Sequence, residues 1–588
     1  MSRGRQTLGY VVEVDGPSVV VNLNDSVRSH VAGHLEGISS FEQPGDLIAI
    51  EAGSETLVAK TLSLSFAEPR ELHSQKKIQA LAKPPLRQLR CAVIGLLRRD
   101  AGSLAFLPQT TRLPALGAQA LPLSADELRA SLNDSSTDVE NRIVVGTEAR
   151  NASLQVGVRI DPLLSRHVAV LGATGQGKTH FVADILQQLA EKPRARIVIF
   201  DVNGEYYPAF KYLGEGVKYT AIGDVPGRNA PSKGASLLKI PYYALGRHGL
   251  FRLLLPSEKT QAPALRFATE HLPYVAADAL GARPSGTSDN VLFDDCRPGD
   301  ATAAYRAIRQ IESRSVLGTT WPHMKALSCL VADSYAMKLD NRGVQVRDAF
   351  AYGHIQSLVN RVNTLINDPR FSAVVNVDGG APVAGGGLNL NRESNRVVEQ
   401  IFGTEKYTDG EPRVHVVDLS QLSQDLMPFV LGSLLELFAE ALFKRGAGKT
   451  HPTVLVLEEA HHYLRQLPGD AESGQHALAY ERLSKEGRKF GLSLLVSTQR
   501  PSELSPTVLA QCGTWVVFRL TNDVDKRAVT SASESSASSI TNELPGLARG
   551  EAVAFGAAFQ IPVRICRQLL PEDRQPDSLD PPFEEKWT

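Results

Sequence analysis

Eight residues, GATGQGKT at positions 172–179, constrain this chain more than any other segment of its sequence. They fit the pattern G-x-x-x-x-G-K-[ST], in which a glycine-rich turn surrounds phosphate groups with backbone N–H groups at the start of a helix. The apolar run His167–Leu171 precedes the turn, and the amphipathic stretch Phe181–Leu189 follows it. A strand, a glycine-rich turn and a helix in this order favour a P-loop nucleotide-binding fold over a purely structural glycine turn.

Each residue type in this turn has a physical task. Gly172, Gly175 and Gly177 allow the backbone to curl tightly around phosphate. Lys178 is expected to reach the β- and γ-phosphates, and Thr179 is expected to give a hydroxyl to Mg²⁺. The predicted ATP-binding residues are Gly172, Ala173, Thr174, Gly175, Gln176, Gly177, Lys178, Thr179 and His180.

A second apolar run is expected to carry carboxylates to the same site. Thr453–Leu457 reads as a strand, and Glu458 and Glu459 follow it. Successive residues of a strand point to opposite sides. We therefore assign Glu458, with Thr179, to the magnesium shell and Glu459 to the activation of water. Asp is commoner than Glu at the first position, and the longer arm of Glu458 favours a metal contact through water. The alternative is a pair of surface carboxylates at a strand end.

Two further residues are candidates for catalysis. Gln499 follows the apolar strand Leu492–Ser497 and is placed to sense the γ-phosphate. Arg488, in the segment KEGRKFG, is a candidate arginine finger that would reach the nucleotide of a neighbouring subunit. Taken alone, Arg488 is better explained as a solvated base at a helix end, and only its place among the other motifs favours the finger. The predicted catalytic residues are Lys178, Glu459, Arg488 and Gln499.

The apolar pattern divides the chain into two kinds of structure. Before residue 150, short runs separated by turn residues predict a small barrel or sandwich: Tyr10–Val14, Val19–Leu23, Leu47–Ala52, Thr56–Leu62, Cys91–Leu97 and Arg142–Gly146. From about residue 165, apolar strands alternate with helices, which indicates a parallel, doubly wound sheet. Residues 250–400 read as a mostly helical insertion, with loops at Gly281–Asp300 and Gly379–Gly387.

Composition narrows the function classes. The 63 basic and 64 acidic residues give a net charge of −1, which excludes a generally polybasic surface. Any nucleic-acid binding must come from a local patch, a pore or a ring of charges in an oligomer. The five cysteines are too scattered for a metal knuckle or a redox pair, which favours reduced thiols in the cytoplasm. No stretch approaches 18 apolar residues, and the N-terminus lacks a secretory signal, so we expect no membrane span.

The motifs together resemble the HerA–FtsK superfamily of ring-forming translocases. GATGQGKT, DVNGEY at 201–206, LEEAHHYL and EGRKFGLSLLVSTQRPSEL follow one another in the HerA order. DVNGEY is similar to a HerA-type Asp-x-His-Gly-Glu-Tyr segment, with Asn203 in place of the histidine. The resemblance also supports Arg488 as a finger acting in trans. It implies that LPGLARGEAVAFGAAFQIPVRIC and the terminal PPFEEKW brace an adjacent subunit.

The resemblance implies an α/β fold, a RecA-like P-loop NTPase core with an N-terminal β-barrel and a helical insertion. The expected domains are residues 1–150, the barrel used in assembly; 151–250, the first part of the ATPase core; 251–400, the helical insertion; 401–570, the second part of the core; and 571–588, a tail that braces a neighbour, anchored by Phe583 and Trp587.

The function implied is a cytoplasmic homohexameric ring that hydrolyses ATP with Mg²⁺ and moves double-stranded DNA through its channel. Its partner would be a NurA-like nuclease in DNA end processing, or a nuclease or sirtuin-type NAD-consuming effector in antiphage defence. The alternative is an ATP-gated scaffold that positions such an effector with little DNA pumping. A membrane-anchored secretion or conjugation ATPase is disfavoured by the lack of an apolar span, and a GTPase by the lack of an N-K-x-D segment. His461 and His462 are expected to hydrogen-bond near the acidic pair rather than bind metal.

Overall fold

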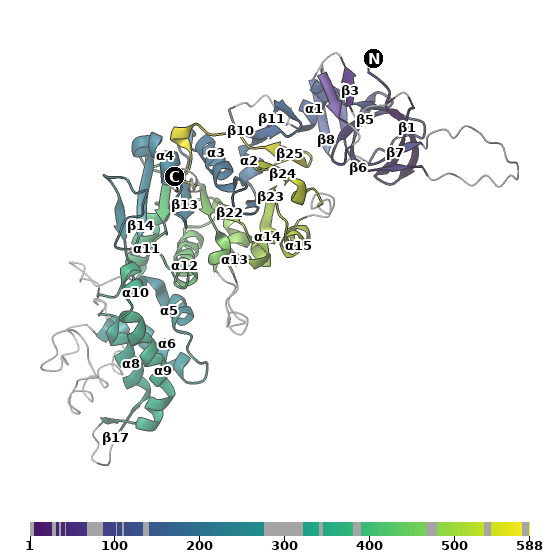
Figure 1. Ribbon diagram of the computed structural model, residues 1–588. Coiled ribbons are helices and arrows are strands. Elements are labelled where there is room, and N and C mark those ends of the chain that lie inside the picture. The colour runs from purple at the N-terminus through teal and green to yellow at the C-terminus, as the bar shows by residue number, and fades with distance from the viewer. Residues whose placement is uncertain are drawn as a thin grey trace, which may run out of the picture. The chain divides into compact units, whose positions relative to one another are not determined.

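The computed structural model describes residues 5–25, 27, 31–34, 37–40, 43–67, 86–100, 103–108, 111–132, 140–275, 322–339, 341, 345–379, 390–465, 479–533, 542–578 and 587. The chain divides into two compact units (Figure 1). Unit 1 contains Met1–Phe181 and Cys512–Leu569, and unit 2 contains Val182–Gln511 and Leu570–Thr588. The predicted strands before residue 150 lie in unit 1, and most of the alternating strands and helices after residue 165 lie in unit 2.

The N-terminal strands of unit 1 form a closed, six-stranded antiparallel barrel, as predicted. Its order is β2-β1-β9-β5-β6-β7, and β7 pairs back with β2. The strands are β1 (Gly9–Asp15), β2 (Ser18–Leu23), β5 (Leu47–Ala52), β6 (Glu55–Phe66), β7 (Arg87–Asp100) and β9 (Gln119–Pro122). Alternate apolar residues face inward and form one buried core that includes Val19, Ile48 and Leu57. Closure leaves no exposed strand edge in the ring of six.

Smaller elements accompany the barrel. β8 (Ser103–Pro108) extends the sheet from β7, and β3 (Val31–His34) pairs with β4 (Gly37–Ser40) as a hairpin. Helix α1 (Ala125–Leu132) begins with a capping box, because the Glu127 N–H donates to Ser124 Oγ while Glu127 Oε2 accepts from the Ser124 N–H.

The second sheet of unit 1 holds β11 (Asn151–Arg159), β10 (Arg142–Glu148), β25 (Val563–Cys566), β24 (Glu551–Gly556), β23 (Cys512–Phe518) and β12 (His167–Leu171), in that order. Only the β12–β23 pair is parallel. The strand predicted at Arg142–Gly146 is β10, and it pairs with β11 and β25 rather than with the barrel. The segment expected to brace a neighbour supplies β24 and β25 of the chain's own sheet. Two short helices, α2 (Ile160–Leu164) and α15 (Asp523–Ala532), complete the described part of the unit.

Unit 2 is built on six parallel strands, which confirms the predicted α/β pattern. Their order is β22 (Leu492–Thr498), β21 (Thr453–Leu457), β13 (Ile197–Asp201), β20 (Val414–Asp418), β14 (Val217–Ile222) and β15 (Ser236–Leu238). β13, β20, β21 and β22 are buried along their whole length, because helices cover both faces of a parallel sheet. The helices beside them are α3 (Lys178–Ala190), α4 (Tyr207–Phe210), α12 (Met427–Arg445), α13 (Ala479–Glu486) and α14 (Pro506–Gln511).

The described part of the predicted insertion is mostly helical. Its described helices are α5 (Gly246–Leu254), α6 (Gln261–Val275), α8 (Lys325–Tyr335), α9 (Ala349–Ile366), α10 (Pro369–Val374) and α11 (Leu390–Phe402). Figure 1 shows α6, α8 and α9 packed side by side. Two small sheets pair β16 (Ile240–Pro241) with β19 (Val375–Asn376) and β17 (Met337–Leu339) with β18 (Gln345–Arg347). The predicted loop Gly281–Asp300 and all but the first residue of Gly379–Gly387 lie outside the described residues.

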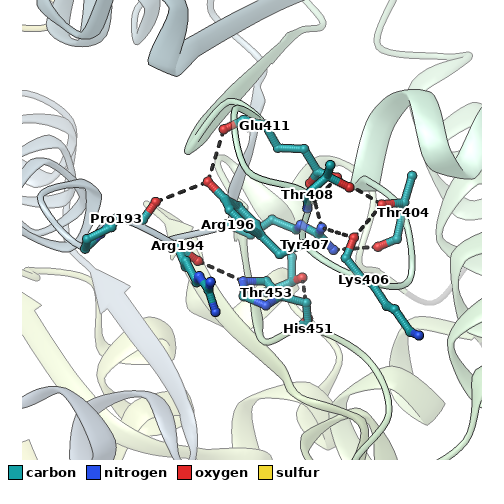
Figure 2. A network of polar contacts seen from close by, with 10 residues as sticks. All are labelled: Pro193, Arg194, Arg196, Thr404, Lys406, Tyr407, Thr408, Glu411, His451 and Thr453. Carbon is teal, nitrogen blue, oxygen red and sulfur yellow. Dashed lines mark hydrogen bonds and ion pairs between the residues drawn. The ribbon is translucent and has the colours of Figure 1, made fainter.

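A buried arginine fixes the amino edge of the unit 2 sheet (Figure 2). Arg196, just before β13, donates from Nη1 to the carbonyl of Thr404 at 2.6 Å and from Nη2 to Glu411 Oε2 at 2.7 Å. Tyr407 lies under the guanidinium and donates its hydroxyl to the carbonyl of Pro193 at 3.1 Å. These contacts hold the segment between α11 and β20 against the sheet, on the edge opposite the strands' carboxyl ends.

Three other expectations concern cysteines, membranes and the tail. The four cysteines among the described residues, Cys91, Cys329, Cys512 and Cys566, are free thiols, and Cys296 lies outside them. None of the described helices is long and apolar enough to cross a bilayer. In the tail, Asp577 accepts a hydrogen bond from Asn229 of the same unit at 3.0 Å, and Trp587 is exposed. Phe583 is not among the described residues, so the bracing role of the tail and the exact domain boundaries stay predictions.

Candidate functional site

The turn GATGQGKT lies in unit 1, between the carboxyl end of β12 and the start of α3, as predicted. Gly175 and Gly177 have φ angles of 72° and 101°, in the left-handed region that favours glycine. Gly172 is required by proximity, because a Cβ added there would lie 2.5 Å from Cβ of Phe518. Larger residues at these positions would deform the turn, so the geometry fits a loop whose backbone N–H groups surround an anion.

Lys178 is already folded across this turn. It is the first residue of α3, is buried, and donates from Nζ to the carbonyl of Ala173 at 3.1 Å. The ammonium group therefore lies over the turn, where a phosphate chain in a P-loop is bound. Thr179 follows on the first turn of the same helix and is half-buried. The structure thus places both residues at the turn, and their roles toward a nucleotide stay predictions.

A cation that the sequence did not predict lies beside the same turn. Arg567 follows β25, and a Cβ built on Gly177 would lie 2.6 Å from its Nε. Backbone bonds fix this placement: the Gly550 N–H donates to the carbonyl of Gln176 at 3.1 Å, and the Arg567 N–H donates to the carbonyl of Gly550 at 2.9 Å. Burial, followed by the charges of Arg567 and Arg549, lowers the pKa of His180 to about 4. His180 is therefore neutral at pH 7, and the arginines supply the positive charge.

Unit 2 gathers polar residues at the carboxyl ends of four neighbouring strands. Asp201 ends β13 directly opposite Asp418 at the end of β20. Glu458 and Glu459 follow β21, and Thr498 ends β22. In parallel sheets this edge is where ligands bind, because the strand interiors are buried and apolar. The structure thus places the predicted acidic pair and the strand that carries Gln499 at one edge.

The acidic pair differs from the prediction in one respect. β21 ends at Leu457, and Glu458 and Glu459 form a turn rather than successive strand positions. Glu459 has φ 42° and ψ 44°, a left-handed conformation that is strained for a residue with a side chain. Its carboxylate direction is therefore set by this turn and its contacts, and the alternation of a strand does not apply.

Each acid has its own support. Glu458 is buried, and the hydroxyl of Tyr463 donates to its backbone carbonyl at 3.0 Å. The fully buried Tyr206 lies beside its carboxylate, and burial together with the Glu458 charge raises the pKa of Tyr206 well above its usual value. Glu459 Oε2 lies 3.3 Å from Nδ1 of His461, and that nitrogen lies 3.0 Å from Oγ1 of Thr498. The expected polar contact of His461 is confirmed, and the described residues contain no metal-type cluster of His, Cys, Asp and Glu.

The segment DVNGEY, which the sequence left without a role, shapes this edge. The Asp201 carboxylate accepts from the N–H groups of Glu205 and Tyr206 at 3.0 and 2.8 Å. In this turn Tyr206 lies beside Glu458, and Asn203 is exposed. Burial, with the nearby charge of Asp201, raises the pKa of Glu205 to about 7, and the charge of Glu459 adds to that rise. The spacing of motifs in the sequence does not predict these contacts, because the two segments are about 250 residues apart.

The remaining predicted residues also lie in unit 2. Gln499 follows β22 and is half-buried. Arg488 lies in the turn Gly487–Phe490 before the same strand, is exposed, and makes no side-chain hydrogen bond or ion pair with the described residues. Because β22 has 7 residues, its two ends are about 20 Å apart. Arg488 therefore belongs to the opposite edge of the sheet from Glu459 and Gln499.

Comparisons with known proteins found a family match and several similar proteins. The family described as helicase HerA, central domain, matches residues 143–289, which include the P-loop and DVNGEY. A probable helicase of Methanocaldococcus jannaschii, MJECL08, is 23% identical over 90% of this chain and 87% of its own length. The DNA double-strand break repair helicase HerA of Pyrococcus furiosus is 22% identical over 72% of this chain and 69% of its own. Among solved structures, VirB4 of Thermoanaerobacter pseudethanolicus aligns over 76% of this chain and all of its own, with 17% identity and a TM-score of 0.43.

The position of Arg567 predicts a direct effect on nucleotide binding. Replacing it with Gln removes a cation next to the turn while keeping a side chain of similar length. We expect the dissociation constant for a fluorescent nucleoside triphosphate to rise about tenfold, the loss of one charge-assisted hydrogen bond. Arg567→Lys, which keeps the charge, should recover most of that affinity. Equal affinity for wild type and Arg567→Gln in a fluorescence titration would show that this guanidinium does not contact the nucleotide.

Proposed function

We propose that this chain, a HerA-like ATPase of the HerA–FtsK superfamily, hydrolyses ATP and uses the energy to move double-stranded DNA. The observation that carries the proposal is the P-loop itself. A turn with three glycines of positive φ and a lysine folded over it lies inside the segment that matches the HerA central domain. Three relatives named helicases align with most of this chain, over 87%, 69% and 77% of their own lengths.

In this proposal the P-loop residues, from Gly172 to His180, bind the triphosphate through backbone N–H groups and the ammonium of Lys178. Thr179 and Glu458 offer a hydroxyl and a carboxylate, the oxygen donors that Mg²⁺ prefers, so they would hold that ion. When bound, Mg²⁺ would neutralise charge on the phosphate oxygens. Arg567 adds a cation from the same subunit.

Glu459 is proposed to orient the attacking water and accept its proton. The left-handed turn and the His461 contact hold its carboxylate in one direction, which a positioned base requires. Gln499 is proposed to sense the γ-phosphate from the end of β22.

The role of Glu459 predicts a separation of binding from turnover. Glu459→Gln keeps the shape of the side chain and removes its basicity. We expect kcat for ATP hydrolysis to fall about 100-fold or more, with the dissociation constant for ATP within about threefold of wild type. Phosphate release and nucleotide titration measure the two quantities. A variant that hydrolyses ATP at the wild-type rate would remove Glu459 from the catalytic residues.

Arg488 is proposed to complete the site of a neighbouring subunit in a homohexameric ring. The exposed side chain and the edge of the sheet on which Arg488 lies support this assignment, because about 20 Å of strand separates it from the acids of its own subunit. With a finger that acts in trans, a subunit hydrolyses ATP only when it is assembled with a neighbour. The rate of hydrolysis in each subunit would then depend on the conformation of the adjacent subunit.

The trans role predicts complementation between two inactive variants. Lys178→Ala lacks a working P-loop lysine, and Arg488→Ala lacks the finger, so neither alone should hydrolyse ATP. In mixed rings, about a quarter of the head-to-tail interfaces pair an intact P-loop with an intact finger. We expect ATPase activity to return on mixing to roughly that fraction of wild type. No recovery, with mixed rings verified by mass, would place the finger in cis or remove it.

The substrate and partner are also part of the proposal. Double-stranded DNA is proposed as the cargo, and the partner is proposed to be a NurA-like nuclease or an antiphage effector, in the cytoplasm. The nearly balanced charge, 63 basic against 64 acidic residues, also suits the alternative of an ATP-gated scaffold for such an effector. The two functions differ in what DNA does to the ATPase.

Duplex DNA should therefore stimulate hydrolysis in a salt-dependent way. We expect ATPase activity to rise severalfold with duplex DNA at 50 mM salt and the stimulation to fade by 200 mM, because contacts to phosphates release counterions. Dextran sulfate, a polyanion without duplex geometry, is the control. An ATPase that ignores duplex DNA at both salt concentrations would favour the scaffold.

A further inference from the structure

We propose that His461 is a positioning residue that couples Glu459 to the end of β22, the strand that carries Gln499. The proposal rests on the proposed ATPase function and deepens it, because it assigns a link between the group that orients water and the group that senses the γ-phosphate. The P-loop lies in unit 1 and therefore does not link these two groups, which both belong to unit 2.

The geometry consists of one nitrogen placed between two strand ends. Nδ1 of His461 lies 3.3 Å from Oε2 of Glu459, which follows β21, and 3.0 Å from Oγ1 of Thr498, the last residue of β22. The His461 side chain is 5% exposed, so water does not compete for these contacts. His462 packs against the ring at a centroid distance of 4.1 Å and limits its rotation.

Charge favours one tautomer of this ring. A carboxylate oxygen 3.3 Å from Nδ1 would repel a lone pair there and attracts an N–H. With the proton on Nδ1, His461 donates to Oγ1 of Thr498, and the Glu459 carboxylate lies within ion-pair distance of the same nitrogen. The Thr498 hydroxyl oxygen also accepts the N–H of Arg500 at 3.0 Å. A shift of Thr498 would therefore move the His461 ring, and the His461 ring in turn sets the direction of the Glu459 carboxylate.

The connection reaches Gln499 through the backbone. Thr498 and Arg500 flank Gln499 and are tied to each other by the bond from the Arg500 N–H to the Thr498 hydroxyl. A shift of Gln499 toward or away from a γ-phosphate would move the turn from Thr498 to Arg500. Thr498, the hydrogen-bond partner of His461, would move with it. Glu459 responds easily, because its left-handed backbone is held in place by such contacts rather than by an intrinsic preference.

Two substitutions at position 461 separate a positioning role from a packing role. His461→Leu keeps apolar bulk and removes the donor, whereas His461→Asn offers an N–H near the place of Nδ1. We expect kcat to fall about 10- to 100-fold in His461→Leu, the range for residues that orient a reacting group, with nucleotide affinity unchanged. His461→Asn should recover at least a third of the wild-type kcat.

A double-mutant cycle tests the coupling to β22. Thr498→Val removes the hydroxyl with little change of shape, and Thr498→Ser retains it. If His461 acts through Thr498, the variant carrying both His461→Leu and Thr498→Val should be no slower than the slower single variant, since residues of one network are not additive. Multiplicative losses of kcat would mean that the two residues act separately, and the link would be rejected.

The outcomes distinguish this inference from the function on which it rests. A wild-type protein that binds ATP without hydrolysing it would remove the ATPase function. An active wild type with an unchanged His461→Leu would remove only the positioning role. A loss of kcat in His461→Leu accompanied by a lower melting temperature and no recovery in His461→Asn would show that the ring merely packs, and would also overturn the proposal.

Discussion

Parallel strands that are buried on both faces can hold polar groups only at their ends, and this constraint governs where chemistry is possible in the chain. β13, β20, β21 and β22 are buried throughout, and Asp201, Asp418, Glu458 and Thr498 stand at or just beyond their carboxyl ends. The P-loop obeys the same rule at the end of β12 in unit 1. The amino edge carries a different kind of contact, since Arg196 binds a connecting segment there.

Crowding carboxylates at one edge is costly, and the fold offsets the cost locally. The Asp201 carboxylate accepts two backbone N–H groups, and the Asp418 carboxylate accepts the hydroxyl of Tyr219 at 2.6 Å and the N–H of Ser420 at 2.8 Å. Burial nevertheless raises the pKa of Asp201, and the neighbouring charge of Asp418 raises it further. The hydrogen bonds of these two acids shape the turns that follow β13 and β20.

Local patterns in the sequence predicted the elements well and the contacts between them poorly. β5, β12 and β21 have the predicted bounds, because each is an apolar run bounded by turn residues or glycine. The P-loop was predictable because its chemistry lies in eight consecutive residues. Arg567 was not, since it reaches Gly177 from about 390 residues away through backbone pairing near Gly550. The turn at Glu458 and Glu459 was missed because a strand's end is the least certain part of any pattern, and the role of DVNGEY depends on contacts with segments distant in sequence.

The exposure of Arg488 has a consequence for how assembly and hydrolysis could be joined. An arginine paired within its own subunit would have to break that pair before it could contact a neighbour's phosphate. Arg488 makes no such side-chain pair with the described residues, so reaching outward costs it little beyond conformational entropy. Within the subunit, β22 connects the turn that carries Arg488 to Thr498 and Gln499 at its other end. A rigid strand with a finger at one end and a sensor at the other would move both together, so the nucleotide state sensed at one site would bear on the cation offered to the next.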